Sequence, residues 1–225
     1  MTGEEAAAEK KLRVKTVKPK KKGVRFSIGS LVLILFCSFL LVISTFLQLD
    51  ITHLIIPAKL FSGEPLKFKD FLYTYQFIPQ IPAVLFIVGL LGRRLGITSI
   101  ILYILIGLFV MPVFALGGGW RYVFEYGFGY ILAYIPAGFL LGTILKKGGY
   151  TYKNTAKAVF LSVLLIHLVG LSYMMGLAVL KHTGWGFVGS WLVSQSGLKI
   201  VYDFIFSYIA VLIAKYARIV LWLYL

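Results

Sequence analysis

Apolar windows recur along the chain, most of them close to the length that a membrane-spanning helix needs. They cover approximately residues 28–49, 77–92, 97–115, 123–145, 157–180 and 198–222. A helix needs about 20 apolar residues to cross the hydrocarbon core of a bilayer, whereas a membrane barrel shows short alternating segments. The pattern therefore predicts an all-α integral membrane protein with six transmembrane helices.

The charges between these windows predict which connections lie on the cytoplasmic side. Nine of the 23 Lys and Arg residues fall within residues 10–25, so the N-terminus is strongly basic. Eight more lie next to the ends of the apolar windows, at Arg93, Arg94, Lys146, Lys147, Lys153, Lys157, Lys215 and Arg218. The intervening connections 50–76, 116–122 and 181–197 are balanced or nearly uncharged. Because Lys and Arg stay inside, we expect both termini in the cytoplasm.

The composition agrees with residence in a membrane and argues against a nucleic-acid partner. The 225 residues are 60% hydrophobic, with a mean hydropathy of +0.90 and a formal charge of +15. This charge is concentrated in the N-terminal segment and the inner connections, as a topology signal would be. We expect a disordered basic tail over residues 1–25 and a cell-membrane domain over 26–225 that contacts the lipid bilayer.

The long connection over residues 50–76 leaves two interpretations open. Its segment Thr52–Phe61 (THLIIPAKLF) is amphipathic, which suits a stretch lying in the outer membrane interface. An ordinary connecting loop explains the same residues, and we expect the loop.

Motifs of enzyme chemistry are missing from the sequence. It contains no H-E-x-x-H, G-x-S-x-G, P-loop or paired-cysteine motif, and Cys37 is its single cysteine. The three histidines lie far apart, and we expect His167 to be a satisfied interior group. The sequence therefore predicts neither an enzyme nor a bound metal or cofactor.

Two ionisable residues near the start of the last window form a candidate site. Lys199 and Asp203 are four residues apart and so share one face of a helix. Ionisable groups inside a span are costly and usually functional. Lys199 either pairs with a carboxylate ligand in an outward cavity or is simply neutralised by Asp203.

A loop rich in glycine and aromatic residues interrupts the apolar pattern between residues 111 and 130. Its three consecutive glycines would let the backbone approach a ligand closely. The side chains of Trp120, Tyr122, Tyr126 and Tyr130 offer apolar walls with polar tips. These features predict the mouth of a pocket for a small, partly apolar molecule, although an interfacial aromatic belt also explains the aromatic residues.

Two segments carry recognisable motifs, residues 80–96 (QIPAVLFIVGLLGRRLG) and residues 107–115 (GLFVMPVFA). The first is similar to the Gln…LLGxRxG segment, and the second to the G…PVFA run, of the BioY family, the biotin-specific S components of energy-coupling factor (ECF) transporters. The following GGGW and FGY look most like the cyanobacterial branch. The family's P-x-D-x-x-K pattern corresponds to residues 194–199, where the lysine is kept and serine replaces proline and aspartate.

This resemblance implies a function and a set of partners. It implies a six-span S component that captures biotin from outside, together with a transmembrane coupling protein and two ATPase subunits that drive uptake. The resemblance and the chemistry of the loop together place the following residues at the substrate: Gln80, Gly117, Gly118, Gly119, Trp120, Tyr126, Gly129, Tyr130, Ser196 and Lys199.

Small residues on the first predicted helix are candidates for contact with the coupling protein. Ser30, Cys37 and Ser44 recur every seven residues and therefore share one face. Small residues let helices approach closely, which suits either docking to a partner or packing within the bundle.

The sequence also leaves three other functions open. Ser196 in place of aspartate is compatible with an S component for another small vitamin. A membrane scaffold that transports nothing is the alternative from another class, and an intramembrane enzyme is a distant third.

Overall fold

The computed structural model describes residues 27–63 and 65–224, so the predicted basic tail lies outside the described residues. Within that part of the chain, five stretches are long and apolar enough to cross a membrane. Four are α2 (Ile28–Phe46), α3 (Gln80–Phe109), α4 (Phe128–Gly148) and α5 (Tyr152–Leu180), and the fifth combines α6 (Trp185–Ser196) with α7 (Lys199–Tyr224). The chain is therefore a multi-pass membrane protein.

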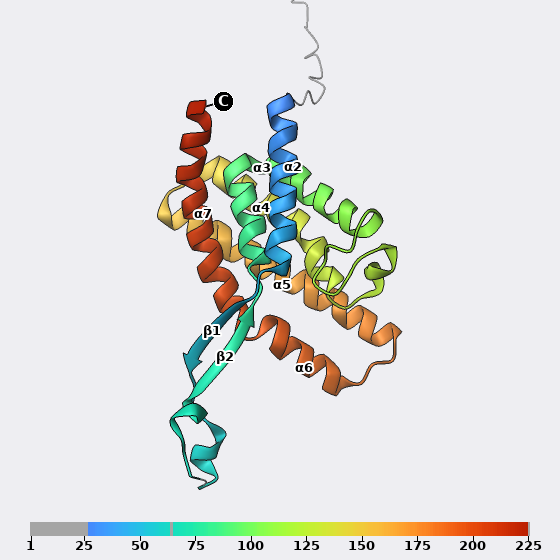
Figure 1. The fold of residues 1–225 in the computed structure, drawn as a ribbon, viewed down its shortest axis with the longest axis vertical. Helices are drawn as coiled ribbons and strands as arrows, with labels where there is room; N and C mark the ends of the chain where they lie inside the picture. The colour runs from blue at the N-terminus through green and yellow to red at the C-terminus, as the bar shows by residue number, and fades with distance from the viewer. Residues whose placement is uncertain (1–26, 64, 225) are drawn as a thin grey trace, which may run out of the picture.

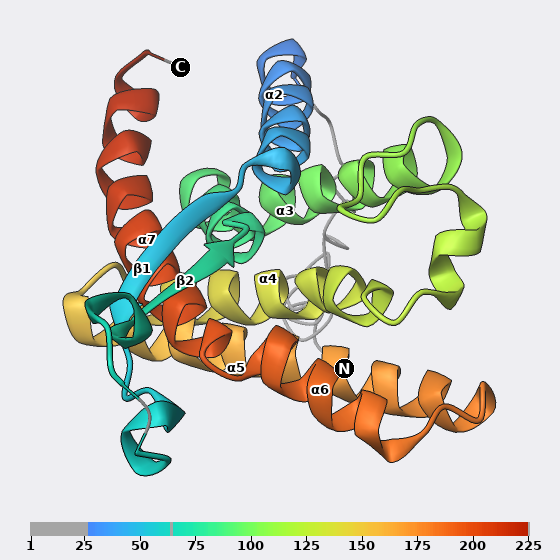
Figure 2. The same ribbon diagram turned by 60° about the horizontal axis from the view of Figure 1, so that its bottom comes forward.

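The helices form a bundle in which α3 is central. It packs against α2, α4 and α7, while α4 lies along α5 (Figure 1). Glycines allow α4 and α5 to approach closely, since a Cβ atom on Gly129 would collide with Tyr173 and one on Gly170 with Tyr130. Helix α6 lies beside α5 and leads directly into α7 (Figure 2).

Helix α3 contains most of the second and third apolar windows and reverses direction between them. Gly92 has a φ of 78°, which favours glycine, and it interrupts the helical backbone. A Cβ atom on Gly96 would lie only 2.8 Å from the Cα of Val88, although residues eight apart in a straight helix are about 12 Å apart. The arm before Gly92, residues 80–91, is about 18 Å long, shorter than the hydrocarbon core.

The expectation of an ordinary connecting loop over residues 50–76 is wrong, although the rest of the fold is mostly helical. Strands β1 (Leu49–Leu54) and β2 (Leu72–Phe77) pair in an antiparallel hairpin, in register from Leu49↔Phe77 to Leu54↔Leu72. Both strands are rich in β-branched or aromatic residues, which suit a pleated surface. The hydroxyl groups of Thr52 and Thr74 are 3.0 Å apart across the pair.

The hairpin is anchored to the bundle at its base and extends away from it toward its tip (Figure 1). Along its strands the hairpin contacts α7, where Tyr75 stacks on Tyr202 with ring centroids 5.7 Å apart. Nearer the far end of the strands, Nδ1 of His53 lies 3.0 Å from the Tyr202 hydroxyl. The tip holds two 3-10 helices, η1 (Ala58–Phe61) and η2 (Phe68–Phe71). There the backbone N–H of Lys67 and the ammonium of Lys59 lower the pKa of Asp70.

The proposed docking face of the first helix is also wrong for two of its three residues. Cys37 is 1% exposed and Ser44 6% exposed, because this side of α2 packs into the bundle. The neighbouring Ser38 donates a hydrogen bond of 2.9 Å to the carbonyl of Ser99 in α3. Small residues permit this close approach of two helices. The exposed face of α2 instead carries large apolar side chains, among them Leu35, Phe36, Phe39, Ile43 and Phe46.

We therefore predict that Cys37→Trp destabilises the folded bundle. The indole would have to fit into a packed interface, and overpacking of this kind costs about 1–3 kcal/mol or more of unfolding free energy. Thermal unfolding in detergent would measure the loss. The matched control is Phe36→Trp on the exposed face, which should leave the midpoint unchanged. Equal midpoints for the two variants would contradict the assignment of Cys37 to the core.

Candidate functional site

A cavity of about 190 Å³ lies at the end of the bundle where the hairpin, the glycine-rich loop and α6 meet. Its wall combines apolar and polar side chains from α3, α4, α6 and α7 and from the loop that precedes α4. The lining residues are Ile78, Gln80, Ile81, Ala115, Leu116, Tyr122, Gly127, Tyr130, Ile131, Tyr134, Trp191, Gln195 and Lys199. Pockets of this kind, mostly apolar with a few polar groups, are typical of small-molecule sites.

Lys199 is the cationic residue of this wall, and it begins α7. Its Nζ lies 2.5 Å from Oδ2 of Asp203, so the ion pair that the sequence left open is formed. Its side chain is nevertheless 16% exposed, whereas that of Asp203 is fully buried. The ammonium also lies 5.6 Å from the ring centroid of Phe77. Lys199 thus contacts both the buried carboxylate and the cavity.

Behind the cavity, a chain of hydrogen bonds connects Asp203 to Tyr130. His167 of α5 is 2% exposed, and its Nε2 lies 3.1 Å from Oδ2 of Asp203. Its Nδ1 lies 2.8 Å from the Ser196 hydroxyl, which is 2.9 Å from the hydroxyl of Tyr130. Both ring nitrogens of His167 are therefore partnered, as expected of a satisfied interior group. Ser196 itself does not line the cavity but connects His167 to Tyr130, which does.

Gln80 lies at the start of α3 and is held by its neighbours. Its Nε2 lies 2.6 Å from the Tyr103 hydroxyl and 3.1 Å from Oγ1 of Thr45. The Oγ1 of Thr45 lies 3.1 Å from the Tyr103 hydroxyl, and both residues are buried. These contacts fix the position of the amide where it borders the cavity.

The three consecutive glycines do not line this cavity, contrary to the expectation that their backbone would face a ligand. Gly117 and Gly119 have φ values of 123° and 83°, so they turn the loop back on itself. A Cβ atom on Gly118 would lie 2.5 Å from the Cα of Pro112. The glycines therefore fold the loop against the end of α3, and the side chains of Ala115 and Leu116 reach the wall instead.

Three other predicted residues lie outside the wall. Trp120 is 62% exposed and packs against Phe124, as a residue of an aromatic belt would. Gly129 faces α5. Tyr126 contacts Trp191 at a ring distance of 5.7 Å, and its hydroxyl is 2.7 Å from that of Thr183, so it supports α6 from outside.

Some lining residues were missed by the sequence analysis, chiefly Trp191 and Tyr134. Trp191 and Gln195 are four residues apart and so share the face of α6 that covers the cavity. Their spacing is a usable signal, but the low charge of residues 181–197 predicts an outer connection there, whereas the structure has a helix. Of the predicted residues, Gln80, Tyr130 and Lys199 do line the wall.

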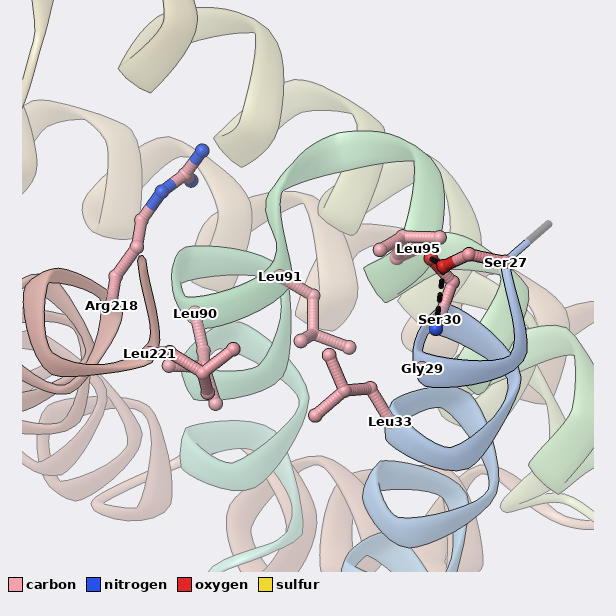
Figure 3. Close-up of a pocket in the computed structure, with 9 residues that line it drawn as sticks. All are labelled: Ser27, Gly29, Ser30, Leu33, Leu90, Leu91, Leu95, Arg218 and Leu221. Carbon is pink, nitrogen blue, oxygen red and sulfur yellow. Dashed lines mark hydrogen bonds between the residues drawn. The ribbon is translucent and has the colours of Figure 1, made fainter. Parts of the chain in front are cut away.

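A second cavity, of about 260 Å³, lies between α2, α3 and α7 (Figure 3). Leucines from these three helices dominate it, with Ser27 and Ser30 at one side. The guanidinium of Arg218 points away from the leucines and lies 3.1 Å from the Tyr150 hydroxyl. This cavity offers few polar groups to a ligand, so the first cavity is the better candidate site.

Comparison with known proteins decides the family. Residues 18–221 match the BioY family, which is nearly the whole chain. The chain belongs to the BioY family.

Two individual proteins illustrate the relationship. The chain is 34% identical over 104 residues to "Probable biotin transporter BioY" of Lysinibacillus sphaericus, a match that covers 43% of this chain and 53% of that protein. The match thus spans about half of the relative's length. The fold is similar to a solved structure of the S component for biotin from an ECF-type ABC transporter, with a TM-score of 0.59 and 21% identity over 85% of this chain and 91% of that one.

Membership in the BioY family agrees with two expectations from the sequence. The family consists of transporter components, so the chain is not an enzyme. The resemblance noted in the sequence is confirmed across nearly its full length. At the motif before α7, Ser196 stands where the resemblance places an aspartate, and the nearest buried carboxylate is that of Asp203, beyond Lys199.

The buried ion pair yields a stability prediction. Lys199→Met would leave the carboxylate of Asp203 buried with only His167 as a partner, and loss of one member of a buried pair costs about 3 kcal/mol of unfolding free energy. Thermal or denaturant unfolding in detergent would measure this cost. The double variant Lys199→Met/Asp203→Asn removes both charges and should be more stable than Lys199→Met alone. A double variant less stable than the single one would contradict a pairwise role.

Proposed function

We propose that this chain is the biotin-capturing S component of an ECF importer. The observation that carries the proposal is the cavity bordered by Lys199, Gln80 and Tyr130, found in a chain of the BioY family. A cation at the edge of a largely apolar pocket suits a ligand with a carboxylate on an apolar body. The two related proteins are described as a probable biotin transporter and as an S component for biotin.

The residues of the wall divide into groups that suit different parts of biotin. Apolar and aromatic side chains such as Ile81, Ile131 and Tyr134 would surround the bicyclic ring. Lys199 would bind the valerate carboxylate through its ammonium. The amide of Gln195 and the hydroxyl of Tyr130 would bind the ureido group by hydrogen bonds.

The same proposal includes six spans with both termini in the cytoplasm. It takes the two arms of α3 as separate spans joined at Gly92, and α6 as a helix at the outer end. Three features support a common inner end. Ser27 and Leu221 border one cavity, Arg218 lies against Gly92, and the Tyr150 hydroxyl lies 2.5 Å from the Gly89 carbonyl. These segments carry the excess of Lys and Arg that stays inside.

We further propose that a transmembrane coupling protein and two ATPase subunits drive uptake. This part follows from the type of transporter named for the similar solved structure. The sequence contains no P-loop motif, so in this proposal the ATPase subunits hydrolyse the ATP. Because Cys37 and Ser44 are buried, the surface that α2 offers to a membrane partner or to lipid is its face of large apolar residues.

The first test is calorimetric titration of the purified full-length protein with biotin in detergent, with other B vitamins as controls. Saturable binding of biotin alone supports the proposal. Selective binding of a different vitamin would favour the second candidate, an S component of altered specificity, for which Ser196 in place of aspartate is the supporting observation. Binding of no vitamin would favour a scaffold.

The role of Lys199 gives a sharper prediction. If its ammonium binds the carboxylate of biotin, Lys199→Ala should weaken binding of biotin by about tenfold or more and binding of biotin amide much less. The difference arises because the amide has no charge for the ammonium to pair with. Titrating both ligands into both proteins measures it.

The matched control for this comparison is Lys215→Ala in the same helix. Lys215 lies against the rings of Tyr152 and Tyr216 and not in the cavity, so its removal should change neither affinity. Equal losses of biotin and biotin amide in Lys199→Ala would contradict the carboxylate role and point to a general loss of the folded site.

A further inference from the structure

The hydrogen bonds behind the cavity have a direction that their donors and acceptors determine. The carboxylate of Asp203 only accepts, so the His167 Nε2 facing its Oδ2 at 3.1 Å must carry a proton. In a neutral imidazole the other nitrogen is then an acceptor. Nδ1 therefore accepts the Ser196 O–H across 2.8 Å, which leaves the Ser196 oxygen to accept the O–H of Tyr130 across 2.9 Å.

His167 is enclosed by the groups of this hydrogen-bond network. Lys199 from α7 pairs with the same oxygen of Asp203, Oδ2, that faces the imidazole, and the imidazole is only 2% exposed. The groups packed against the ring from α4 and α6 are the uncharged side chains of Tyr130 and Ser196.

We propose that Asp203 and His167 are positioning residues that, through Ser196, hold the Tyr130 hydroxyl as a hydrogen-bond acceptor toward the cavity. The hydroxyl of Tyr130 donates its single proton to Ser196, so its oxygen can only accept further hydrogen bonds. The wall at Tyr130 then selects a ligand that presents an N–H donor. The urea ring of biotin has such donors, and for that ligand the inference rests on the proposed function.

The direction of the hydrogen bonds from Tyr130 to Asp203 is testable without any ligand. Nitrogen NMR of the full-length protein labelled at histidine reports which ring nitrogen carries the proton, and His167→Gln identifies the signals of His167 among the three histidines. We expect protonated Nε2 and unprotonated Nδ1 at neutral pH. A proton on Nδ1 would overturn the proposal, because Ser196 would then accept from His167 and its own proton would be free for the Tyr130 oxygen, so the contacts would no longer hold the Tyr130 hydroxyl as an acceptor.

The selectivity is testable with biotin and with biotin methylated on its ureido nitrogens. The measured quantity is the ratio of the dissociation constant of the methylated ligand to that of biotin. We expect this ratio to fall by about tenfold in Tyr130→Phe, which removes the acceptor. It should also fall in Ser196→Ala, which frees the Tyr130 hydroxyl to rotate. In the double variant Tyr130→Phe/Ser196→Ala the ratio should fall no further than in Tyr130→Phe, because both substitutions act through one hydroxyl.

A control separates this effect from a general change in α6. Ser194→Ala removes an exposed hydroxyl of the same helix that lies 3.1 Å from the Trp191 carbonyl, and it should leave the ratio unchanged. An unchanged ratio in Ser196→Ala would overturn the proposal. So would a ratio in the double variant that falls by the product of the two single effects.

The two tests also separate this inference from the proposed function. If biotin does not bind while Nε2 of His167 is protonated and Nδ1 is not, biotin is not the ligand, but the direction of the hydrogen bonds is confirmed. If biotin binds tightly while Nδ1 is protonated, the proposed function stands and the positioning role of Asp203 and His167 is wrong.

Discussion

The buried carboxylate of Asp203 is the constraint on which the functional end of the bundle depends. A carboxylate with no exposure in an apolar interior is tolerated only when it is paired and hydrogen-bonded. Its partners are Lys199, one turn earlier in α7, and His167 in α5. Through these contacts one charge joins α5 to α7 and determines where the lysine ammonium lies. The edge of the cavity is thus positioned by an electrostatic requirement of the interior.

Close packing of α4 against α5 places the other members of this network. A side chain on Gly170 would collide with Tyr130, so glycine there lets the Tyr130 ring lie beside His167, with ring centroids 5.8 Å apart. The Tyr130 hydroxyl can then reach Ser196 at the end of α6. Small residues within the bundle therefore serve the site as well as stability. Small residues likewise let α2 pack against α3, where Cys37 is buried and Ser38 bonds to the carbonyl of Ser99.

The site could be predicted from sequence only where a single element carries the information. Gln80, Tyr130 and Lys199 were predicted because each stands in a recognisable segment, and each borders the cavity. Trp120 and Gly118 stand in equally recognisable segments but do not border it. Their segment is a loop whose path depends on contacts with the end of α3, and no local periodicity encodes those contacts.

The sequence by itself determined the membrane setting, most of the long helices, the family and the shared face of Lys199 and Asp203. These follow from hydropathy, helical spacing and local motifs, which act within one segment. Only the tertiary structure decided that Asp203 also binds His167, that residues 50–76 form a hairpin and that Trp191 borders the cavity. Each of these depends on residues distant in the chain, since a buried charge, a strand and a cavity wall require partners from other segments.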